Sequence, residues 1–149
     1  MCLVEFIIRP AVRNDFPGIR SLIHAVHINP TGLDWRRFLV AETKDGELIG
    51  CGQIKPHSDG SRELASLAVH MHYRGQGVAR ALIVHLLDGQ THPIHLMCRS
   101  RLGLLYNKFG FHALSEKEMT PYFQRINRIM RLFASSRATE DKLLIMQLD

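Results

Sequence analysis

The chain has 149 residues, 46% hydrophobic and 22% charged, which is enough for one globular core and too few for a second domain of ordinary size. Nineteen Lys and Arg against 14 Asp and Glu give a formal net charge of +5, which favours association with phosphate-rich or acidic molecules. No apolar run reaches the about 20 residues of a membrane span, and the N-terminus lacks the pattern of a signal peptide. We therefore expect a single domain over residues 1–149.

The residues that could form disulfides or bind metals show no pattern typical of either. Cys2, Cys51 and Cys98 are odd in number and have no C-x-x-C spacing, which predicts reduced thiols and a cytoplasmic protein. His70 and His72 stand two residues apart, but no cysteine or carboxylate accompanies them at ligand spacing. We expect no bound metal.

The N-terminal part of the chain predicts a strand, a helix and a loop. Residues 3–9 are an apolar run that ends at Pro10 and predict a strand. Asn14-Asp15 is a helix cap signal, and the apolar spacing after it predicts a helix to about His27. Residues 29–37 contain a proline and a glycine and predict a loop.

A hairpin is expected next. Residues 38–43 and 47–54 predict two strands, and Lys44-Asp45-Gly46 between them is a strong turn signal. Gly50 and Gly52 lie inside the second strand, which indicates a bulge or a close backbone approach.

The central stretch of the chain predicts an anion site. Residues 62–70 predict a strand, residues 78–88 predict a helix, and the glycine-rich run Tyr73–Ala79 connects them. The first N–H groups of a helix have no partner within it and the helix dipole is positive there, so a phosphate can bind. Glycine lets the phosphate approach the backbone closely.

The C-terminal part predicts three further strands and two helices. Residues 93–98 predict a strand, and residues 102–109 predict a helix. Strands are expected over 111–115 and 141–148, and a helix over 121–133, with Thr120 as its N-cap, lies between them. That helix has Tyr122, Ile126, Ile129 and Phe133 on one face and Arg125, Arg128 and Arg131 on the other.

Two motifs decide between the nucleotide-binding folds that such a loop allows. Arg80 stands where a dinucleotide fold needs its third glycine, and no Gly-Lys-Ser/Thr ending marks a Walker loop. The run from Arg74 through Gly77 to Ala79 resembles the acyl-CoA-binding motif R/Q-x-x-G-x-G/A of the GNAT N-acetyltransferases. Residues 105–111, LYNKFGF, resemble that family's L-Y-x-K-x-G-F element.

The resemblance implies the GNAT fold, an α/β architecture with a mixed, twisted sheet of six or seven strands flanked by helices. It covers roughly residues 5–112 and the last strand, and leaves a helical insertion at about 116–140. The activity that it implies is N-acetylation, in which the acetyl group of acetyl-CoA moves directly to a primary amine in a ternary complex. No covalent enzyme intermediate is implied.

By the same resemblance, backbone N–H groups of the glycine loop hold the pyrophosphate of acetyl-CoA, and strand residues before it pair with the pantetheine arm. Arg74 and Arg80 are nearby cations, although solvated surface charge is the alternative for both. Arg99 stands where the family often has an asparagine, and Ser100 beside it could replace that asparagine in part. The expected cofactor-binding residues are Leu67, Ala68, Val69, Arg74, Gly75, Gln76, Gly77, Val78, Ala79, Arg80 and Ser100.

Two residues are expected to move protons. Tyr106 occupies the family position whose hydroxyl protonates the leaving thiolate, and a tyrosine packed in the core is the alternative. Glu63 occupies the position of the glutamate base in the histone-acetylating branch. Strand alternation predicts one shared face for Glu63, Ala65, Leu67 and Val69. A surface glutamate at the strand end, or a water relay in place of a single base, remains open.

The acceptor is not determined by these motifs. A small amine, a protein amine and an aminoacyl-tRNA all remain, and a homodimer is compatible with each. The basic face of helix 121–133 could contact nucleic acid, although such a row of arginines is more often a solvated surface. The alternative functions are an acyl-CoA-binding regulatory module without catalysis, whose helix docks a partner, and a nucleic-acid-binding protein without enzymatic activity.

Overall fold

The computed structural model describes residues 3–133 and 142–149, and their contacts separate into two compact units. Unit 1 is Met1–Lys55 with Leu64–Gln90, and unit 2 is Pro56–Glu63 with Thr91–Asp149. Cys2 and the 134–140 part of the expected insertion lie outside the described residues. The expectation of one domain over the whole chain stays a prediction.

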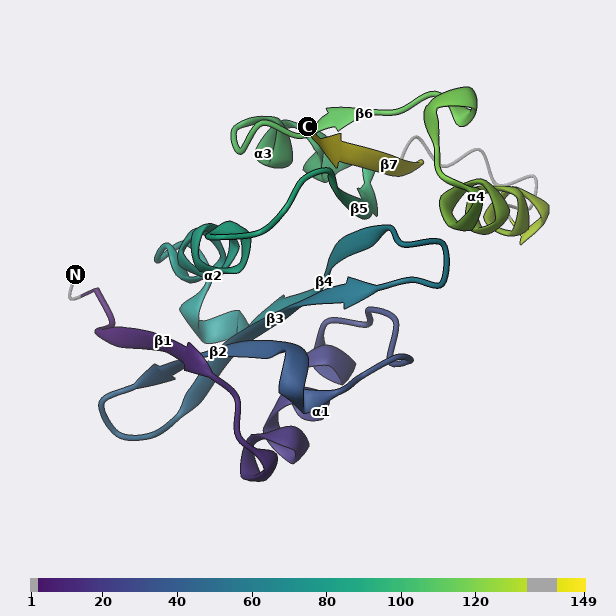
Figure 1. The fold of residues 1–149 in the computed structure, drawn as a ribbon. Helices are drawn as coiled ribbons and strands as arrows, with labels where there is room; N and C mark the ends of the chain where they lie inside the picture. Colours follow the sequence, from purple (N-terminus) through teal and green to yellow (C-terminus); the bar gives the residue numbers. More distant parts are fainter. Residues whose placement is uncertain (1–2, 134–141) are drawn as a thin grey trace. The chain divides into compact units, whose positions relative to one another are not determined.

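Unit 1 contains four strands in the order β1-β2-β3-β4 and two α-helices (Figure 1). The β1–β2 and β2–β3 pairs are antiparallel. The strands and helices are β1 (Phe6–Pro10), α1 (Phe16–Ala25), β2 (Phe38–Thr43), β3 (Leu48–Pro56), β4 (Arg62–Val69) and α2 (Val78–Leu87). Of β3, the residues up to Lys55 belong to unit 1, and of β4, the residues from Leu64 onward. Short 3-10 turns stand at Arg13–Asp15, Trp35–Arg37 and Met71–Tyr73.

The two helices of unit 1 cover opposite faces of its sheet (Figure 1). Neighbouring residues of a strand point to opposite faces, and consecutive residues of β4 accordingly belong to different hydrophobic clusters. Ala68 packs in the cluster that contains Ile19, Leu22 and Ile23 of α1. Val69 packs in the cluster that contains Val78 and Leu82 of α2.

The glycines of β3 allow α2 to lie close to the sheet. A Cβ atom added at Gly50 would stand 2.9 Å from Val78 Cγ1, and one added at Gly52 would stand 2.8 Å from Leu86 Cδ1. Both distances are too short for a real side chain, so any larger residue would push the helix away. The expectation here is a bulge or a close backbone approach. The register between β2 and β3 shifts beside Gly50, between Ala41 and Glu42, whereas the atoms nearest to the two glycines belong to side chains of α2.

Ser66 interrupts the regular pleat of β4. Its φ is +57°, a left-handed conformation that is uncommon for a residue with a side chain. Ala68 and Val69 are both buried because α1 and α2 cover the two faces of the sheet. Leu67 and Val69 both pack in the cluster that contains Val78 and Leu82 of α2, so these two residues share one face as predicted. That Glu63 and Ala65, on the other side of Ser66, lie on the same face stays a prediction.

Unit 2 contains the remaining strands in the order β5, β7, β6. The β5–β7 and β7–β6 pairs are both antiparallel. Glu63, in the first part of β4, pairs in parallel register with His95 of β5. The elements are β5 (Ile94–Arg99), α3 (Gly103–Asn107), β6 (His112–Ala113), α4 (Pro121–Phe133) and β7 (Leu143–Leu148), with 3-10 turns at Ser100–Leu102 and Glu116–Glu118.

The expected mixed sheet is confirmed, with seven strands in the described residues. The element ends differ from expectation near residue 110. The helix expected over 102–109 ends at Asn107, because the N–H groups of Phe109 and Phe111 both bond to the carbonyl of Tyr106. The strand expected over 111–115 keeps only two residues. None of the helices among the described residues is both long and apolar enough to cross a membrane.

Candidate active site

The loop between β4 and α2 has an open backbone. Gly75 and Gly77 have φ values of +77° and +84°, and a Cβ atom added at either would meet no heavy atom of the described residues within 4 Å. Gly77 is the N-cap of α2, and no side chain within residues 3–133 and 142–149 caps that end of the helix. The first N–H groups of α2 therefore lie beside open space, where an anion can bind to them.

Side chains on either side of these glycines hold the loop in place. Gln76 Oε1 accepts a hydrogen bond of 2.8 Å from the backbone N–H of Val4. Tyr73 donates its hydroxyl to Glu47 Oε2 at 2.6 Å, and this hydrogen bond raises the pKa of Tyr73. The Gln76 side chain thus has a structural partner, so its expected role in cofactor binding rests on its backbone.

The other expected cofactor residues of unit 1 lie on β4 and at the start of α2. β3 occupies one edge of β4, and the backbone N–H of His70 bonds to the carbonyl of Ile49 at 2.8 Å. The side chains of Arg74 and Arg80 are exposed next to the glycines. The pairing of Leu67, Ala68 and Val69 with a pantetheine arm stays a prediction.

Glu63 is buried in unit 2 and has a histidine partner. Its side chain is 7% exposed, and its Oε1 lies 2.7 Å from Nε2 of His57, whose side chain is 5% exposed. The alternative of a surface glutamate at the strand end is therefore wrong. His57 stands six residues earlier in the β3–β4 loop, and neither residue type nor spacing predicted its contact with Glu63.

Helix α4 covers this pair. The Tyr122 ring stacks on the His57 ring with centroids 3.6 Å apart, and Phe123 meets the same ring edge-on at 5.7 Å. Phe123 also stacks on His95, which is 1% exposed. The expected insertion thus supplies two aromatic side chains around His57, the partner of Glu63, which sequence reasoning did not place there.

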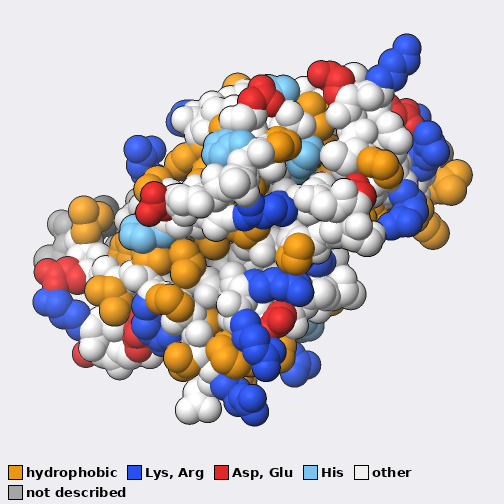
Figure 2. Space-filling model, viewed as in Figure 1, with side chains coloured by type: hydrophobic (Ala, Val, Ile, Leu, Met, Phe, Trp, Pro, Cys, Tyr) orange, Lys and Arg blue, Asp and Glu red, His pale blue; other side chains and the backbone are white. Residues whose placement is uncertain are grey.

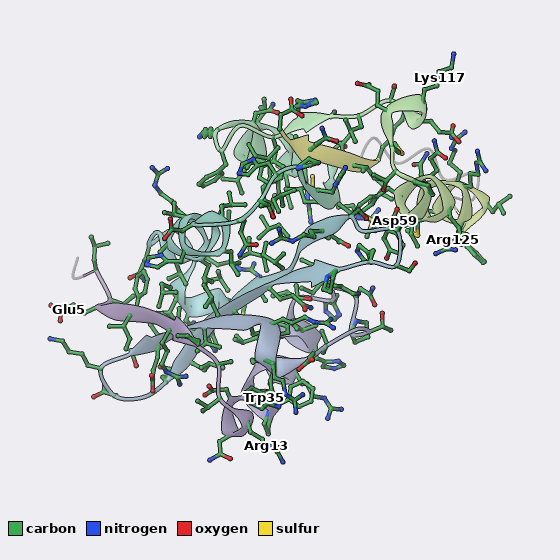
Figure 3. The ribbon with its side chains drawn as sticks, viewed as in Figure 1. Glu5, Arg13, Trp35, Asp59, Lys117 and Arg125 are labelled. Atoms are coloured by element: carbon green, nitrogen blue, oxygen red, sulfur yellow. The ribbon has the colours of Figure 1, made fainter. Side chains whose placement is uncertain are left out.

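Asp59 joins the β3–β4 loop to the start of α4. Its Oδ2 accepts a 2.9 Å bond from the N–H of Tyr122, and its Oδ1 accepts bonds from the N–H and hydroxyl of Ser61. Burial raises the pKa of Asp59, but these hydrogen bonds outweigh it and hold the pKa well below its ordinary value. Figure 3 labels Asp59 at the loop and Arg125 on α4.

Tyr106 lies on α3 and is 9% exposed. Burial, with a smaller contribution from Cys98, raises the pKa of Tyr106 to about 12, so the phenol holds its proton at neutral pH. Its ring meets Phe111 edge-on at 6.1 Å. A proton donor and a packed core tyrosine are both compatible with this setting.

Ser100 lies at the end of β5 and bridges to β7. Its N–H donates to the carbonyl of Lys142 at 2.7 Å, and its Oγ accepts from the N–H of Lys142 at 3.0 Å. These two bonds fix the end of the strand. The expected substitution of Ser100 for a pantetheine-binding asparagine stays a prediction.

The expected site residues thus fall in two groups. Unit 1 holds Leu67–Val69 together with Arg74–Arg80, and unit 2 holds Glu63, Ser100 and Tyr106. In neither group do three or more His, Cys, Asp or Glu side chains of the described residues gather as a metal site would need.

The basic face of α4 is partly neutralised. Arg128 and Arg131 both pair with Glu116, and Arg125 lies over the Tyr122 ring at 5.9 Å. Figure 2 shows blue basic and orange apolar side chains mixed around this helix, where Leu132 and Phe133 are exposed. Contact with nucleic acid through this face stays a prediction.

Comparison with protein families identifies one domain. The profile described as "Acetyltransferase (GNAT) domain" matches residues 34–113, which include the glycine loop, Glu63 and Tyr106. No protein of curated function matches the chain.

Solved structures with the same fold include acetyltransferases. N-acetylglutamate synthase from Neisseria gonorrhoeae, complexed with coenzyme A and N-acetyl-glutamate, is 23% identical with a TM-score of 0.73 over 97% of this chain. Rv2747 from Mycobacterium tuberculosis, in complex with CoA and NLQ, is 21% identical with a TM-score of 0.70 over 95% of this chain. Escherichia coli ElaA is 16% identical with a TM-score of 0.67 over 98%.

These proteins differ in how much of their own length the chain accounts for. The chain spans 35% of the Neisseria synthase, but 98% of Rv2747 and 99% of ElaA. At these identities the likeness establishes the fold, which is the GNAT fold that the two motifs predicted.

Proposed function

The chain belongs to the acetyltransferase (GNAT) domain family, and we propose that it is an N-acetyltransferase that moves the acetyl group of acetyl-CoA to a primary amine. The observation that carries this proposal is the open backbone at the start of α2. Among the residues that the structure describes, Gly75 and Gly77 leave space where any other residue would place a side chain, and no side chain caps the helix N-terminus beyond them. Such a terminus suits a pyrophosphate.

The chain's residues fit acetyl-CoA in charge as well as in shape. The N–H groups of Gly75–Ala79 would bind the pyrophosphate, and the exposed Arg74 and Arg80 would add positive charge beside it. When bound, acetyl-CoA supplies an activated acetyl carbon for direct transfer. Two structural neighbours were solved with CoA, which supports the same ligand here.

The reaction requires two proton movements. The C–N bond forms as the C–S bond breaks, one proton leaves the amine nitrogen, and one proton reaches the sulfur. Tyr106 is the proposed donor to the sulfur, because it occupies the family position of the donor and its phenol carries a proton at neutral pH. Glu63, with His57 at 2.7 Å, is the proposed acceptor of the amine proton, directly or through water.

The proposed acceptor class is a small amine or a protein amine. An aminoacyl-tRNA acceptor has less support, because Glu116 pairs with two of the three arginines that would face the nucleic acid. The Neisseria neighbour was solved with N-acetyl-glutamate, so amino acids belong in any screen for the acceptor.

The first test is calorimetric titration of acetyl-CoA and CoA into the protein and two double variants. Asp and Asn are nearly equal in size, and both tolerate positive φ better than other side chains. Gly75→Asp with Gly77→Asp adds negative charge at the proposed phosphate site, whereas Gly75→Asn with Gly77→Asn does not. We expect micromolar binding by the wild type, and binding at least about tenfold weaker in the Asp variant than in the Asn variant.

The second test is transfer to a panel of amines: L-glutamate, L-arginine, spermidine, a peptide with a free α-amine, and a peptide with one lysine. We expect transfer to at least one, with kcat lowered about a hundredfold in Tyr106→Phe. Absence of CoA binding by the wild type would refute the proposal. Binding without transfer to any amine would favour the non-catalytic acyl-CoA-binding module.

A further inference from the structure

Gln53, on β3 of unit 1, has a buried oxygen without a partner. The side chain is 0% exposed, and its Nε2 lies 2.8 Å from Ser66 Oγ and 3.5 Å from the carbonyl oxygen of Gly32. Since a carbonyl can only accept, the amide atom that faces Gly32 is the nitrogen. Within the described part of the chain, Gln53 Oε1 makes no hydrogen bond.

An oxygen in this state is costly. A buried acceptor that has lost water and gained no donor destabilises the folded state by about 1–3 kcal/mol. Most buried polar atoms of native proteins are satisfied by protein groups or ordered water, so Gln53 Oε1 needs a donor that the described residues do not supply. Gln53 Oε1 is thus an acceptor to which a ligand with an N–H or O–H group can bind.

The residue that Gln53 contacts is strained and lies beside the strand proposed to bind the thioester. Ser66 has φ +57°, and two β3 side chains hold it, since Gln53 donates to its Oγ and the Cys51 thiol donates to its carbonyl at 3.6 Å. Leu67–Val69 follows directly. Backbone strain of this kind is concentrated at functional sites.

We propose that Gln53 binds the acceptor amine, with its Oε1 accepting a hydrogen bond from one N–H of the nucleophile. This inference rests on the proposed acetyl transfer. The amine nitrogen becomes positively charged as its bond to the acetyl carbon forms, so this hydrogen bond strengthens in the transition state and raises kcat. The lone pair of the nitrogen stays free for the attack.

The role of Gln53 has a consequence for substrate choice. A neutral primary amine has two N–H groups, one that stays on the nitrogen for Gln53 and one whose hydrogen leaves as the proton. Its N-methyl analogue has one N–H for both purposes. Gln53 should therefore favour primary amines over their N-methyl analogues.

The test compares wild type with Gln53→Met, which keeps side-chain length and removes the acceptor oxygen. Each panel amine that the wild type acetylates is assayed together with its N-methyl analogue. We expect kcat/KM for the primary amine to fall about tenfold to a hundredfold. The value for the N-methyl analogue should change much less, so that the preference is lost. Calorimetric binding of CoA by Gln53→Met should equal that of the wild type. The matched control is Gln90→Met, which makes the same substitution at a half-buried glutamine after α2 and should leave both CoA binding and the amine preference unchanged.

A second variant separates substrate binding from support of Ser66. If Gln53 acted only by holding Ser66, Ser66→Gly would relieve the strain and restore the activity of Gln53→Met. Such rescue would overturn the inference, as would an unchanged amine preference in Gln53→Met. If the wild type acetylates no panel amine, the inference falls together with the proposed function. If the wild type transfers acetyl and Gln53→Met keeps the wild-type preference for primary amines over their N-methyl analogues, the inference alone is refuted.

Discussion

Nε2 of His57 and Oε1 of Glu63 lie 2.7 Å apart, and both side chains are more than nine-tenths buried. The pair is local in sequence, six residues apart, but it is buried by aromatic residues of α4 that come some sixty positions later. Its environment is apolar on the α4 side, where the Tyr122 ring lies against the imidazole. The hydrogen bond between these two side chains should therefore contribute to stability as well as to proton transfer.

We predict that His57→Phe lowers the free energy of unfolding by on the order of 2 kcal/mol in urea denaturation at neutral pH. Phenylalanine keeps an aromatic ring to stack on Tyr122, so the loss isolates the hydrogen bond between His57 and Glu63 Oε1. Adding Glu63→Leu to this variant should recover at least half of the loss, because the second change removes the buried carboxylate. A double variant as unstable as His57→Phe would show that the pair is not the cause.

The glycine loop and the hairpin could be predicted from sequence because each depends on residues within a few positions. Gly75 and Gly77 have positive φ, as their place in a strand–loop–helix motif required. The Glu63–His57 contact depends on the packing of a loop against a distant helix, which no local pattern encodes. Ser66 was also missed, since serine carries no signal for a left-handed conformation inside a strand.

We predict that Gly50→Ala destabilises the protein by about 1–3 kcal/mol, measured by urea denaturation. The added Cβ would stand 2.9 Å from Val78 Cγ1 and 3.0 Å from Leu82 Cδ1, so helix α2 must shift. Gly52→Ala should act in the same way through Leu86 Cδ1 at 2.8 Å.

The control for the glycine variants is a double-mutant cycle. Val78→Ala removes the Cγ1 atom that the new methyl group would meet, so Gly50→Ala should cost less in that background than in the wild type. Additive losses would indicate that crowding by Val78 is not responsible. The same cycle with Leu86→Ala applies to Gly52.

The proposed site is only partly predictable for a related reason. The family motifs place Tyr106 and the glycine loop by position, and both have the local structure that their roles need. What a motif does not specify is the environment of each group, which decides its protonation. Tyr106 has a raised pKa because it is buried, and burial follows from the fold as a whole.

We predict that burial of Tyr106 makes stability fall at alkaline pH. The pKa of Tyr106 is about 12 in the folded protein and 10.0 for an ordinary tyrosine, so between these values the unfolded chain has released a proton that the folded chain keeps. Because the folded state binds more protons, the free energy of unfolding decreases as pH rises through this range. Wild type should therefore lose about 1 kcal/mol more than Tyr106→Phe between pH 9 and 11.

The Tyr106→Phe comparison cancels other groups that titrate in the same range, such as Cys51, whose pKa burial also raises to about 12. An ultraviolet difference titration of wild type against Tyr106→Phe measures the phenol directly. A midpoint near 12 would confirm that burial raises the pKa of Tyr106 in the folded protein. A midpoint near 10, with parallel stability profiles for the two proteins, would mean that Tyr106 is solvated and that its burial does not set its protonation.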